Sequence, residues 1–340
     1  MQHFKILERA WMKTWRYRAL WIFGLFVALS AGGGGGRSSG SNAASQTMGQ
    51  GFRGGVDLPD PLVGFLVTLV VIFIVLLIVA ALIFGLFALV ARYLGDSALM
   101  QLVDREEADG TTPMLADGFQ FSWSTATLRL FAIDVVVGIP TAIISFVLIL
   151  FSATPLLLWF TKDVGAGILG TVLAVGLFMF MLILIGLLGA SIGVVSPYYR
   201  RRTVLAERGV FASIGEGISL VFRHLGDVLL MWLIMIVVNI LGGLALTLAA
   251  LLLILLVLLI VGLPVLLFGW LFSAVFNTSL GYVIGAVGTL PWFFGLVLLP
   301  SLLFQAVFEV FKSTVWTLTY RELLNMEPKL TIDTGESDGE

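Results

Sequence analysis

The chain has 340 residues, of which 59% are hydrophobic and only 12% are charged. Soluble domains carry about 25% charged residues, so the composition excludes an ordinary soluble protein. A net charge of −2 gives no strong attraction for nucleic acid, and the lack of cysteine excludes disulfides, thiolate catalysis and cysteine-bound metals. Because there are also only two histidines, we expect no enzyme activity, no metal site and no cofactor.

Long uncharged stretches determine the fold class that we predict. An apolar stretch of 18 or more residues is typical of a membrane-spanning helix, whereas strands of an outer-membrane barrel alternate in polarity. Leu130–Thr161 contains one charged residue, Asp134, and three other stretches contain none: Pro61–Ala91, Val164–Tyr199 and Val228–Phe308. The sequence therefore predicts an all-α, polytopic helical membrane protein with about six transmembrane helices and additional interfacial amphipathic helices.

The opening stretch LERAWMKTWRYRALWIFG, from Leu7 to Gly24, joins tryptophans and cations to the start of an apolar segment. We interpret it as an interfacial helix that leads into a first span at about Trp15–Ala31. The alternative is a signal peptide cleaved near Ala28–Ser30. A long, tryptophan-rich leading region that carries Glu8 argues against cleavage.

Further spans follow in chain order. The predicted positions are Leu62–Ala91 for the second, Thr127–Phe151 for the third with a kink near Pro140, and Gly165–Val195 for the fourth. The fifth span begins at Val228 and the last ends near Lys312. The region between these two ends is much longer than two spans of about 20 residues.

Helix-breaking residues divide this last region, at Gly242-Gly243, Gly262–Pro264, Asn277–Gly281, Pro291 and Pro300. We favour two long spans with a broken or re-entrant segment around Pro264–Phe276. Four spans, and so eight in total, are the alternative. Both arrangements place the two termini on the same side of the membrane.

The distribution of cations predicts the orientation. With six spans, all but three of the 19 lysines and arginines lie on the side of the termini, and the exceptions are Arg37, Arg53 and Lys162. Cytoplasmic loops carry an excess of Lys and Arg. We therefore expect a multi-pass protein of the inner (cytoplasmic) membrane with both termini in the cytoplasm.

Three stretches share one pattern: RAWMKTWRYRALWIFG from Arg9, DGFQFSWSTATLRLFAID from Asp117 and EGISLVFRHLGDVLLMWL from Glu216. Each combines a short amphipathic helix with the start of a span, and a polar helix follows the second span of each set. The corresponding apolar positions, which we call the anchor residues, are Trp11 and Trp15, Phe119 and Trp123, and Ile218 and Phe222. This pattern predicts a threefold internal repeat, with units at about 5–110, 111–210 and 211–326. The alternative is that aromatic belts recur at every membrane entry.

The domain organisation that follows is a single membrane domain over residues 1–326. Residues 32–60 are rich in Gly and Ser and are predicted to form a flexible exterior loop. The acidic tail at 327–340 is predicted to be disordered. The carboxylate cluster DREEAD, Asp104–Asp109, is interpreted as a solvated helix face, because its spacing matches no calcium loop.

The stretches AW…TWRYRALWIFG, GDVLLMWLI and STVWTLTYREL resemble a group of bacterial multi-pass membrane proteins of unknown function. That group is similar to the membrane domain attached to some glycerophosphodiester phosphodiesterases. The catalytic barrel of those enzymes, with its histidine and carboxylate metal ligands, has no counterpart in this sequence, so their activity is not implied. The resemblance implies a membrane domain in an envelope or lipid context.

Three residues form a candidate intramembrane polar site. Asp134 lies inside the third span, where a carboxylate is costly, and is therefore either functional or bonded to a neighbouring helix. Glu309 lies three residues before Lys312 and is expected to pair with it. Asn239 is expected to hydrogen-bond between helices.

Four cations are candidate contacts for anionic lipid headgroups: Arg200, Arg201, Arg202 and Arg223. The alternative is that they only set the topology. The leading functional hypothesis is a non-catalytic scaffold, accessory subunit or lipid-interacting component, with the bilayer, anionic lipids or an unidentified membrane protein as partners. A transporter that uses Asp134 and broken helices around Gly242 and Pro264 is the second hypothesis, and a membrane-embedded enzyme the third.

Overall fold

The computed structural model describes residues 2–30, 60–161, 163–206, 209–276, 288, 292 and 294–326. These residues are almost all helical and contain no strand. Five helices are long and apolar enough to cross a membrane: Val75–Asp109, Thr125–Thr161, Val164–Leu205, Leu225–Phe272 and Gly295–Met326. The protein is therefore an all-α polytopic membrane protein, as the uncharged stretches predicted.

The first predicted span begins later than expected. Trp15 belongs to the preceding helix, and the apolar helix α2 covers Leu20–Ser30, which is 11 residues. At 1.5 Å per residue this segment is about 16 Å long, shorter than the ~30 Å hydrocarbon core. The rest of that span, the exterior loop before Asp60 and the acidic tail lie outside the described residues. Six spans therefore stays a prediction.

The described helices follow one order three times: a short amphipathic helix, an apolar helix and a long return helix. The first set is α1 (His3–Arg16), α2 and α3 (Asp60–Asp109). The second is α4 (Leu115–Ser122), α5 (Thr125–Ser152), with the 3-10 turn η2 (Thr154–Thr161), and α6 (Val164–Leu205). The third is α7 (Val210–Arg223), α8 (Leu225–Val257) and, after the α9 segment, α11 (Leu299–Met326).

The polar helices predicted after the return spans are not separate elements. Each is the end of one long return helix, which runs to Asp109 in α3, to Leu205 in α6 and to Met326 in α11. No proline stands between span and polar segment in α3, and a single glycine such as Gly95 is tolerated in a helix at a cost of about 1 kcal/mol. In each return helix the membrane-spanning segment and the polar segment after it therefore form one continuous helix.

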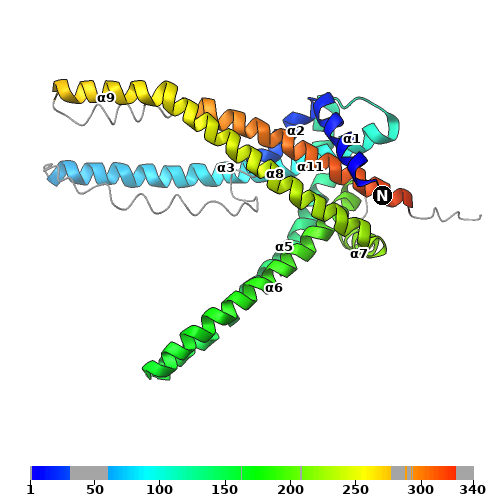
Figure 1. Cartoon of the computed structure of the whole chain (residues 1–340), viewed down its shortest axis with the longest axis horizontal. Helices are drawn as coiled ribbons and strands as arrows, with labels where there is room; N and C mark the ends of the chain where they lie inside the picture. Colours follow the sequence, from blue (N-terminus) through cyan, green and yellow to red (C-terminus); the bar gives the residue numbers. More distant parts are fainter. Residues whose placement is uncertain are drawn as a thin grey trace, which may run out of the picture.

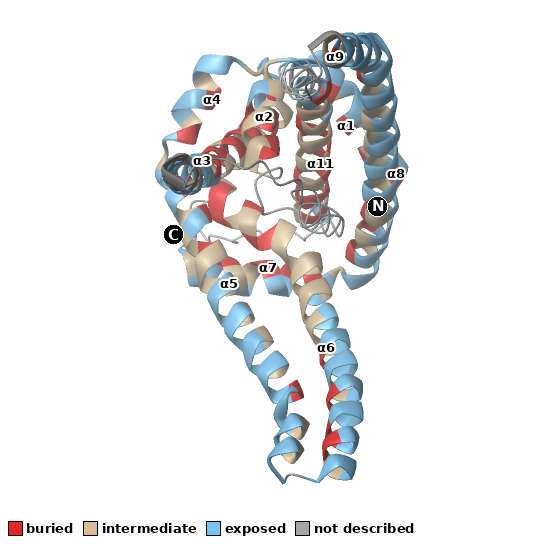
Figure 2. Ribbon diagram, turned by 90° about the vertical axis from the view of Figure 1, so that its left-hand side faces the viewer, coloured by how far each residue is buried: buried red, intermediate tan, exposed pale blue. Residues whose placement is uncertain are grey.

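Figure 1 shows the apolar helices extending away from a base that contains α1, α7 and one end of α11. The α5–α6 pair diverges from the direction shared by α3, α8 and α9. In Figure 2 the buried residues gather in this base, whereas the α5–α6 pair is mostly exposed along its length. Packing within the protein is thus concentrated at one end of the spans.

The core of the base consists of four hydrophobic clusters. The first joins α2, α3 and α11 through Phe23, Leu99 and Val310. The second joins α1, α8 and α11, and the third joins α3, α5 and α6 around Leu130. The fourth joins α6, α7, α8 and α11 around Tyr198. Because α11 contributes to three of the four clusters, it holds the first and last sets together.

The expected break in the last region is wrong. The helix α8 continues through the π-helix η3 (Leu258–Gly262) into α9 (Leu263–Phe276) without interruption. Pro264 has no N–H and its ring presses on the carbonyl four residues earlier, and the wider π turn directly before it accommodates both effects. The helix also passes through Gly242, where an added Cβ would overlap the Phe308 ring. Gly242 therefore makes room for α11 rather than breaking α8.

Three of the four carboxylates of DREEAD are paired with cations of other helices and only Asp109 is exposed, so the interpretation as a solvated face is wrong. Lys13 of α1 pairs with both Glu106 and Glu107. Arg9 of α1 lies 3.3 Å from Glu107, and Asp104 accepts a hydrogen bond of 3.1 Å from an arginine of α11. The cluster thus ties the amphipathic helix α1 to the ends of two return helices.

We expect Lys13→Gln to loosen α1 because it leaves two carboxylates without their shared cation. Lys13 and Glu106 are 15% and 13% exposed, so the loss of the pair should cost about 1–3 kcal/mol. Hydrogen exchange should accelerate within α1 and less so in α11. The matched control is Lys5→Gln, because Lys5 lies on the exposed surface of the same helix. Equal exchange in the two variants would contradict this role of Lys13.

Candidate functional site

The three consecutive arginines near the end of α6, which we call the arginine triplet, reach three different groups of partners. Arg200 Nη2 lies 3.1 Å from Asp96 of α3 and 3.1 Å from Asp134 of α5. Both distances fit charge-assisted hydrogen bonds. The intramembrane carboxylate Asp134 therefore finds its partner on a neighbouring helix, which is the second of the two roles that its position suggested.

Arg201 is turned into the protein and is only 4% exposed. Its Nε donates to Thr317 Oγ1 at 3.1 Å and its Nη2 donates to the Ser313 carbonyl at 3.0 Å, both on α11. Its Nη1 donates to the Pro197 carbonyl on its own helix. The expectation that Arg201 contacts lipid headgroups is thus contradicted by its burial. Arg200 is also engaged with protein groups rather than directed to the surface.

Arg202 completes the triplet on the other side of α6. Its Nε donates to Glu216 of α7, and its Nη1 lies 3.4 Å from the Tyr320 hydroxyl of α11. The triplet therefore connects α6 to α3, α5, α7 and α11. These contacts attach the diverging α5–α6 pair to the rest of the base.

A pocket of about 240 Å³ opens between α3, α6, α8 and α11, and we call it the mixed-charge pocket. Its polar lining residues are Asp96, Ser196, Arg200, Arg201, Asn239, Glu309, Lys312 and Ser313. Asn239 and Glu309 of the predicted intramembrane polar site line this pocket together with the predicted headgroup contacts Arg200 and Arg201. Asp134 does not line the pocket but is bonded to Arg200, which does. The structure brings together three polar residues from three separate spans.

Within the mixed-charge pocket, Glu309 and Asn239 each bond to a group on their own helix. Lys312 Nζ lies 2.6 Å from Glu309 Oε1, which confirms the predicted pair. Asn239 Nδ2 donates to the Met235 carbonyl of its own helix at 2.8 Å rather than to another helix. Arg200 Nε and Ser313 Oγ are buried without a hydrogen-bond partner in the described part of the chain. Both atoms are enclosed by protein, and the pocket is suited to water or a polar solute through its other polar lining groups.

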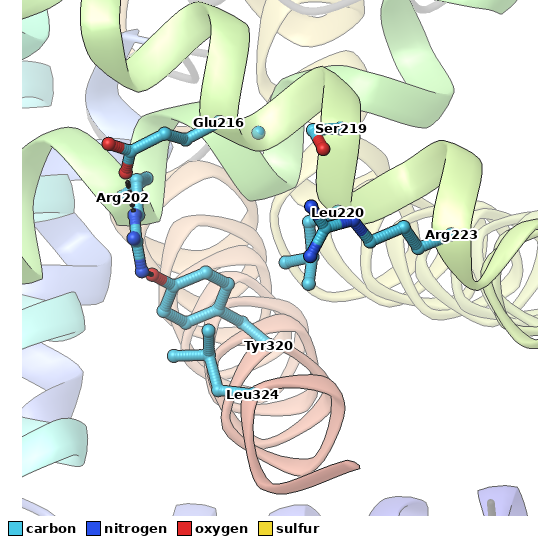
Figure 3. A pocket seen from close by; sticks show the side chains of 8 residues that line it. Arg202, Glu216, Ser219, Leu220, Arg223, Tyr320 and Leu324 are labelled. Carbon is cyan, nitrogen blue, oxygen red and sulfur yellow. Dashed lines mark hydrogen bonds and ion pairs between the residues drawn. The ribbon is translucent and has the colours of Figure 1, made fainter. Parts of the chain in front are cut away.

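A second pocket, of about 220 Å³, lies between α6, α7 and α11, and we call it the arginine pocket (Figure 3). Its lining residues are Arg202, Glu216, Gly217, Ser219, Leu220, Arg223, Tyr320 and Leu324. Figure 3 shows Arg202 with Glu216 and Tyr320 along one wall and Arg223 reaching in from the opposite side. Two of the predicted headgroup contacts, Arg202 and Arg223, therefore share one pocket.

Gly217 allows α7 to lie directly on α6 beside this pocket. An added Cβ at Gly217 would lie 2.8 Å from Tyr199 Cα, which is too close for any larger residue without movement of the backbone. The close approach positions Arg223 on α7 and Arg202 on α6 around one space.

The anchor residues of the three amphipathic helices are all exposed. Their exposed fractions range from 37% for Ile218 to 77% for Trp123. Leaving apolar side chains uncovered at repeated positions of amphipathic helices is typical of helices that lie in a membrane interface. The core of the base is formed mainly by the opposite faces of α1 and α7, through residues such as Ile6 and Leu220. Trp11 and Phe119 touch core rings, those of Phe311 and Phe23, but remain about half exposed.

An apolar groove of about 510 Å³ runs between α3 and the start of α5. It is lined by Leu86 and Tyr93 of α3, by Leu128 and Phe131 of α5, and by the anchor Trp123 between α4 and α5. Its lining is almost entirely apolar, and one end lies beside Tyr93, one helical turn before Asp96. The groove suits an apolar chain rather than a polar solute.

Comparison with known proteins gave no relative: no protein-family model, curated protein or solved structure matches the chain.

Three residues that line the two polar pockets escaped the sequence analysis. Asp96 is the first carboxylate after the second span, and Ser219 and Tyr320 stand in amphipathic or polar helix ends. Each comes to line a pocket only because helices that are distant in the sequence meet in the base. The order of charges along the chain indicates that Asp96 lies near the membrane surface, but it does not indicate its partner.

Proposed function

We propose that the protein is a non-catalytic, lipid-interacting component of the inner membrane, with both termini in the cytoplasm. The exposed anchors on three amphipathic helices are the observation that carries this proposal. Aromatic rings are favoured at membrane interfaces, and the anchors would hold the base of the molecule at the headgroup level. The excess of cations on the side of the termini supports the orientation.

Two further features agree with contact to lipid. The apolar groove offers a place for an acyl chain, and the arginine pocket offers cations near a span entrance. The resemblance to membrane domains attached to glycerophosphodiester phosphodiesterases also supports a lipid context. In the most apolar part of each span at most 22% of the residues are buried within the protein, so lipids or the helices of a partner protein would cover the remaining apolar surface.

A transporter is the second candidate function, and the mixed-charge pocket favours it. Asp96, Arg200, Asn239 and Glu309 gather there from four helices, as residues of a solute site would. However, α8 and α9 are continuous at Gly242 and Pro264, so the broken helices that this hypothesis needed are absent from the described residues. The α5–α6 pair also diverges from the direction of the other spans (Figure 1).

Extraction of the full chain in native nanodiscs, followed by lipid and protein analysis of the same sample, separates these functions. We expect enrichment of anionic lipid over the bulk membrane without a stoichiometric protein partner. A stoichiometric partner would instead make the protein an accessory subunit. A co-extracted solute would favour transport, and a lipid shell with bulk composition would count against the proposal.

The anchors can be tested directly because the chain has no cysteine of its own. We expect a spin label at Trp11→Cys to be accessible to oxygen, which dissolves in lipid, and protected from a water-soluble nickel reagent. A label at Lys5→Cys should show the reverse, because Lys5 is exposed about 120° away on the same helix. Equal accessibility at both positions in vesicles would show that α1 does not lie in the interface.

A further inference from the structure

The mixed-charge pocket presents both kinds of charge from different helices. Asp96 of α3 and Glu309 of α11 supply carboxylates, and Arg201 of α6 supplies a guanidinium group. The last predicted span ends near Lys312, which also lines the pocket. The pocket therefore lies close to a membrane surface, where both soluble molecules and lipid headgroups occur.

Each of the two lining carboxylates keeps one oxygen free. Arg200 Nη2 binds Asp96 through Oδ2, and Lys312 Nζ binds Glu309 through Oε1. Oδ1 of Asp96 and Oε2 of Glu309 accept no hydrogen bond from the described residues. Neither oxygen is among the polar atoms that are enclosed without a partner, so solvent reaches both. Since a carboxylate can accept through both oxygens, two negatively charged acceptors are available to an ammonium group.

Arg201 offers the opposite charge. Its three hydrogen bonds all go to neutral oxygens, two on α11 and one on its own helix, and no carboxylate of the described residues is bonded to it. A guanidinium group has five N–H donors, so two donors remain. Arg201 is only 4% exposed, and a buried cation without a bonded anion is costly. An anionic oxygen group in the pocket would accept from Arg201 and offset this cost.

The charges around the pocket are already balanced within the described part of the protein. Three cations and three carboxylates line the pocket or bond to its lining: Arg200, Arg201, Lys312, Asp96, Glu309 and Asp134. A ligand with a single charge would upset this balance. A neutral ligand that carries one charge of each sign would preserve it and would still use the free donors and acceptors.

We propose that the mixed-charge pocket binds a small zwitterion, in which a primary ammonium group and an anionic oxygen group belong to one molecule. The ammonium group donates to Asp96 and Glu309, and the anionic group accepts from Arg201. A volume of about 240 Å³ is below the roughly 300–1,000 Å³ of pockets that enclose a drug-sized ligand, so the ligand is small. A free amino acid and the headgroup of an aminophospholipid share this chemistry. The headgroup as source rests on the proposed function, whereas binding of a zwitterion does not.

The first test is equilibrium dialysis of the full chain in phosphatidylglycerol nanodiscs against three probes of similar size. L-Alanine carries both charges, propionate carries only the carboxylate and alaninamide carries only the ammonium group. L-Alanine should bind about tenfold more tightly than either of the others, because each charged group adds its own hydrogen bonds. Equally tight binding of L-alanine and one of the other probes would overturn the proposal, since one charge would then suffice.

The matching variant is Glu309→Gln, which removes one carboxylate from the pocket. It should weaken L-alanine binding about tenfold and leave propionate binding unchanged or stronger, because propionate has no ammonium group. A misfolded pocket would lose both ligands. Glu322→Gln is the control, because Glu322 is a paired carboxylate of the same helix that does not line the pocket. Equal L-alanine affinity in the two variants would contradict the proposal.

A second arm identifies the source of the zwitterion by native mass spectrometry with lipid. Phosphatidylethanolamine is compared with phosphatidylglycerol, which has the phosphate but no ammonium group. A preference for phosphatidylethanolamine that Glu309→Gln removes and Glu322→Gln keeps would identify a headgroup, and L-alanine binding without this preference would identify a free solute. If Glu309→Gln changes neither, the proposal is overturned. That failure would leave the interfacial position of the anchors untouched, because the spin labels measure it separately.

Discussion

Arg200→Met is expected to lower the free energy of unfolding by about 3 kcal/mol, the lower end of the range for breaking a buried ion pair. The substitution leaves Asp96 and Asp134 facing the same space without their shared cation. These carboxylates are 13% and 23% exposed, so water relieves only part of their repulsion. The loss should appear as easier unfolding by denaturing detergent in micelles.

The charge origin of this effect is tested by removing all three charges together. Arg200→Met combined with Asp96→Asn and Asp134→Asn should recover more than half of the lost stability, because no unpaired carboxylate remains. The matched control is Arg18→Met, which removes an exposed arginine and should stay within about 0.5 kcal/mol of the parent. An equal loss in the single and triple variants would show that the stem of Arg200 matters rather than its charge.

Local patterns predicted the membrane architecture well. A hydrocarbon environment requires every backbone N–H and C=O to be bonded within the helix, so long uncharged stretches have almost no structural alternative. The same holds for the pair of Glu309 and Lys312, which needs only one turn of one helix. The anchors such as Trp123 were also visible, because an exposed apolar stripe is a property of a single helix.

Contacts between distant helices were not predictable from these patterns. The pairing of Asp134 with Arg200 depends on how α5 and α6 cross α3 in the base. Within its own helix, the nearest cation to Asp134 in the sequence is Arg129, which is five residues away and lies on a different side of the helix. The arginine triplet likewise has a spacing typical of topology signals or headgroup contacts. Only the packing of α6 shows that Arg201 is enclosed by α11.

The misplaced break near Pro264 has a different cause. Proline and glycine pairs interrupt helices in water, where freed backbone groups find other partners. Inside a membrane those partners are lacking, so the backbone keeps its internal bonds and absorbs the proline in one π turn, Leu258–Gly262. Treating proline and glycine as helix breakers, as in soluble proteins, therefore predicts a break between α8 and α9 that is not present in this membrane helix.

The base, rather than the spans, is where this protein has a defined internal structure. The four clusters, the arginine triplet and both polar pockets lie there, and the spans leave it with most of their surface uncovered. Variants in the base should therefore change stability, and variants on the spans should change contacts with lipid or partner helices. The same substitution, glycine to alanine, can be made in both regions, and its effects on stability can then be compared.

Gly24→Ala is expected to destabilise the protein by about 1–3 kcal/mol, the range for adding a methyl group to a packed core. An added Cβ at Gly24 would overlap the Ala306 carbonyl oxygen of α11 and would lie 2.6 Å from Val310 Cγ2. The overlapped atom belongs to the backbone, so no side-chain rotation relieves the contact. Because Phe23 is buried in the first cluster, α2 cannot shift away without opening it.

The control for this prediction is Gly85→Ala in α3, where an added Cβ meets no atom within 4 Å. There the better helix propensity of alanine should leave stability unchanged or raise it by up to about 1 kcal/mol. Both variants are measured by unfolding in the same micelles, and Gly24→Leu should lose more than Gly24→Ala. Similar stability for Gly24→Ala and Gly85→Ala would mean that α2 and α11 do not pack at this distance. The first set of helices would then be held to α11 through α1 and α3 alone.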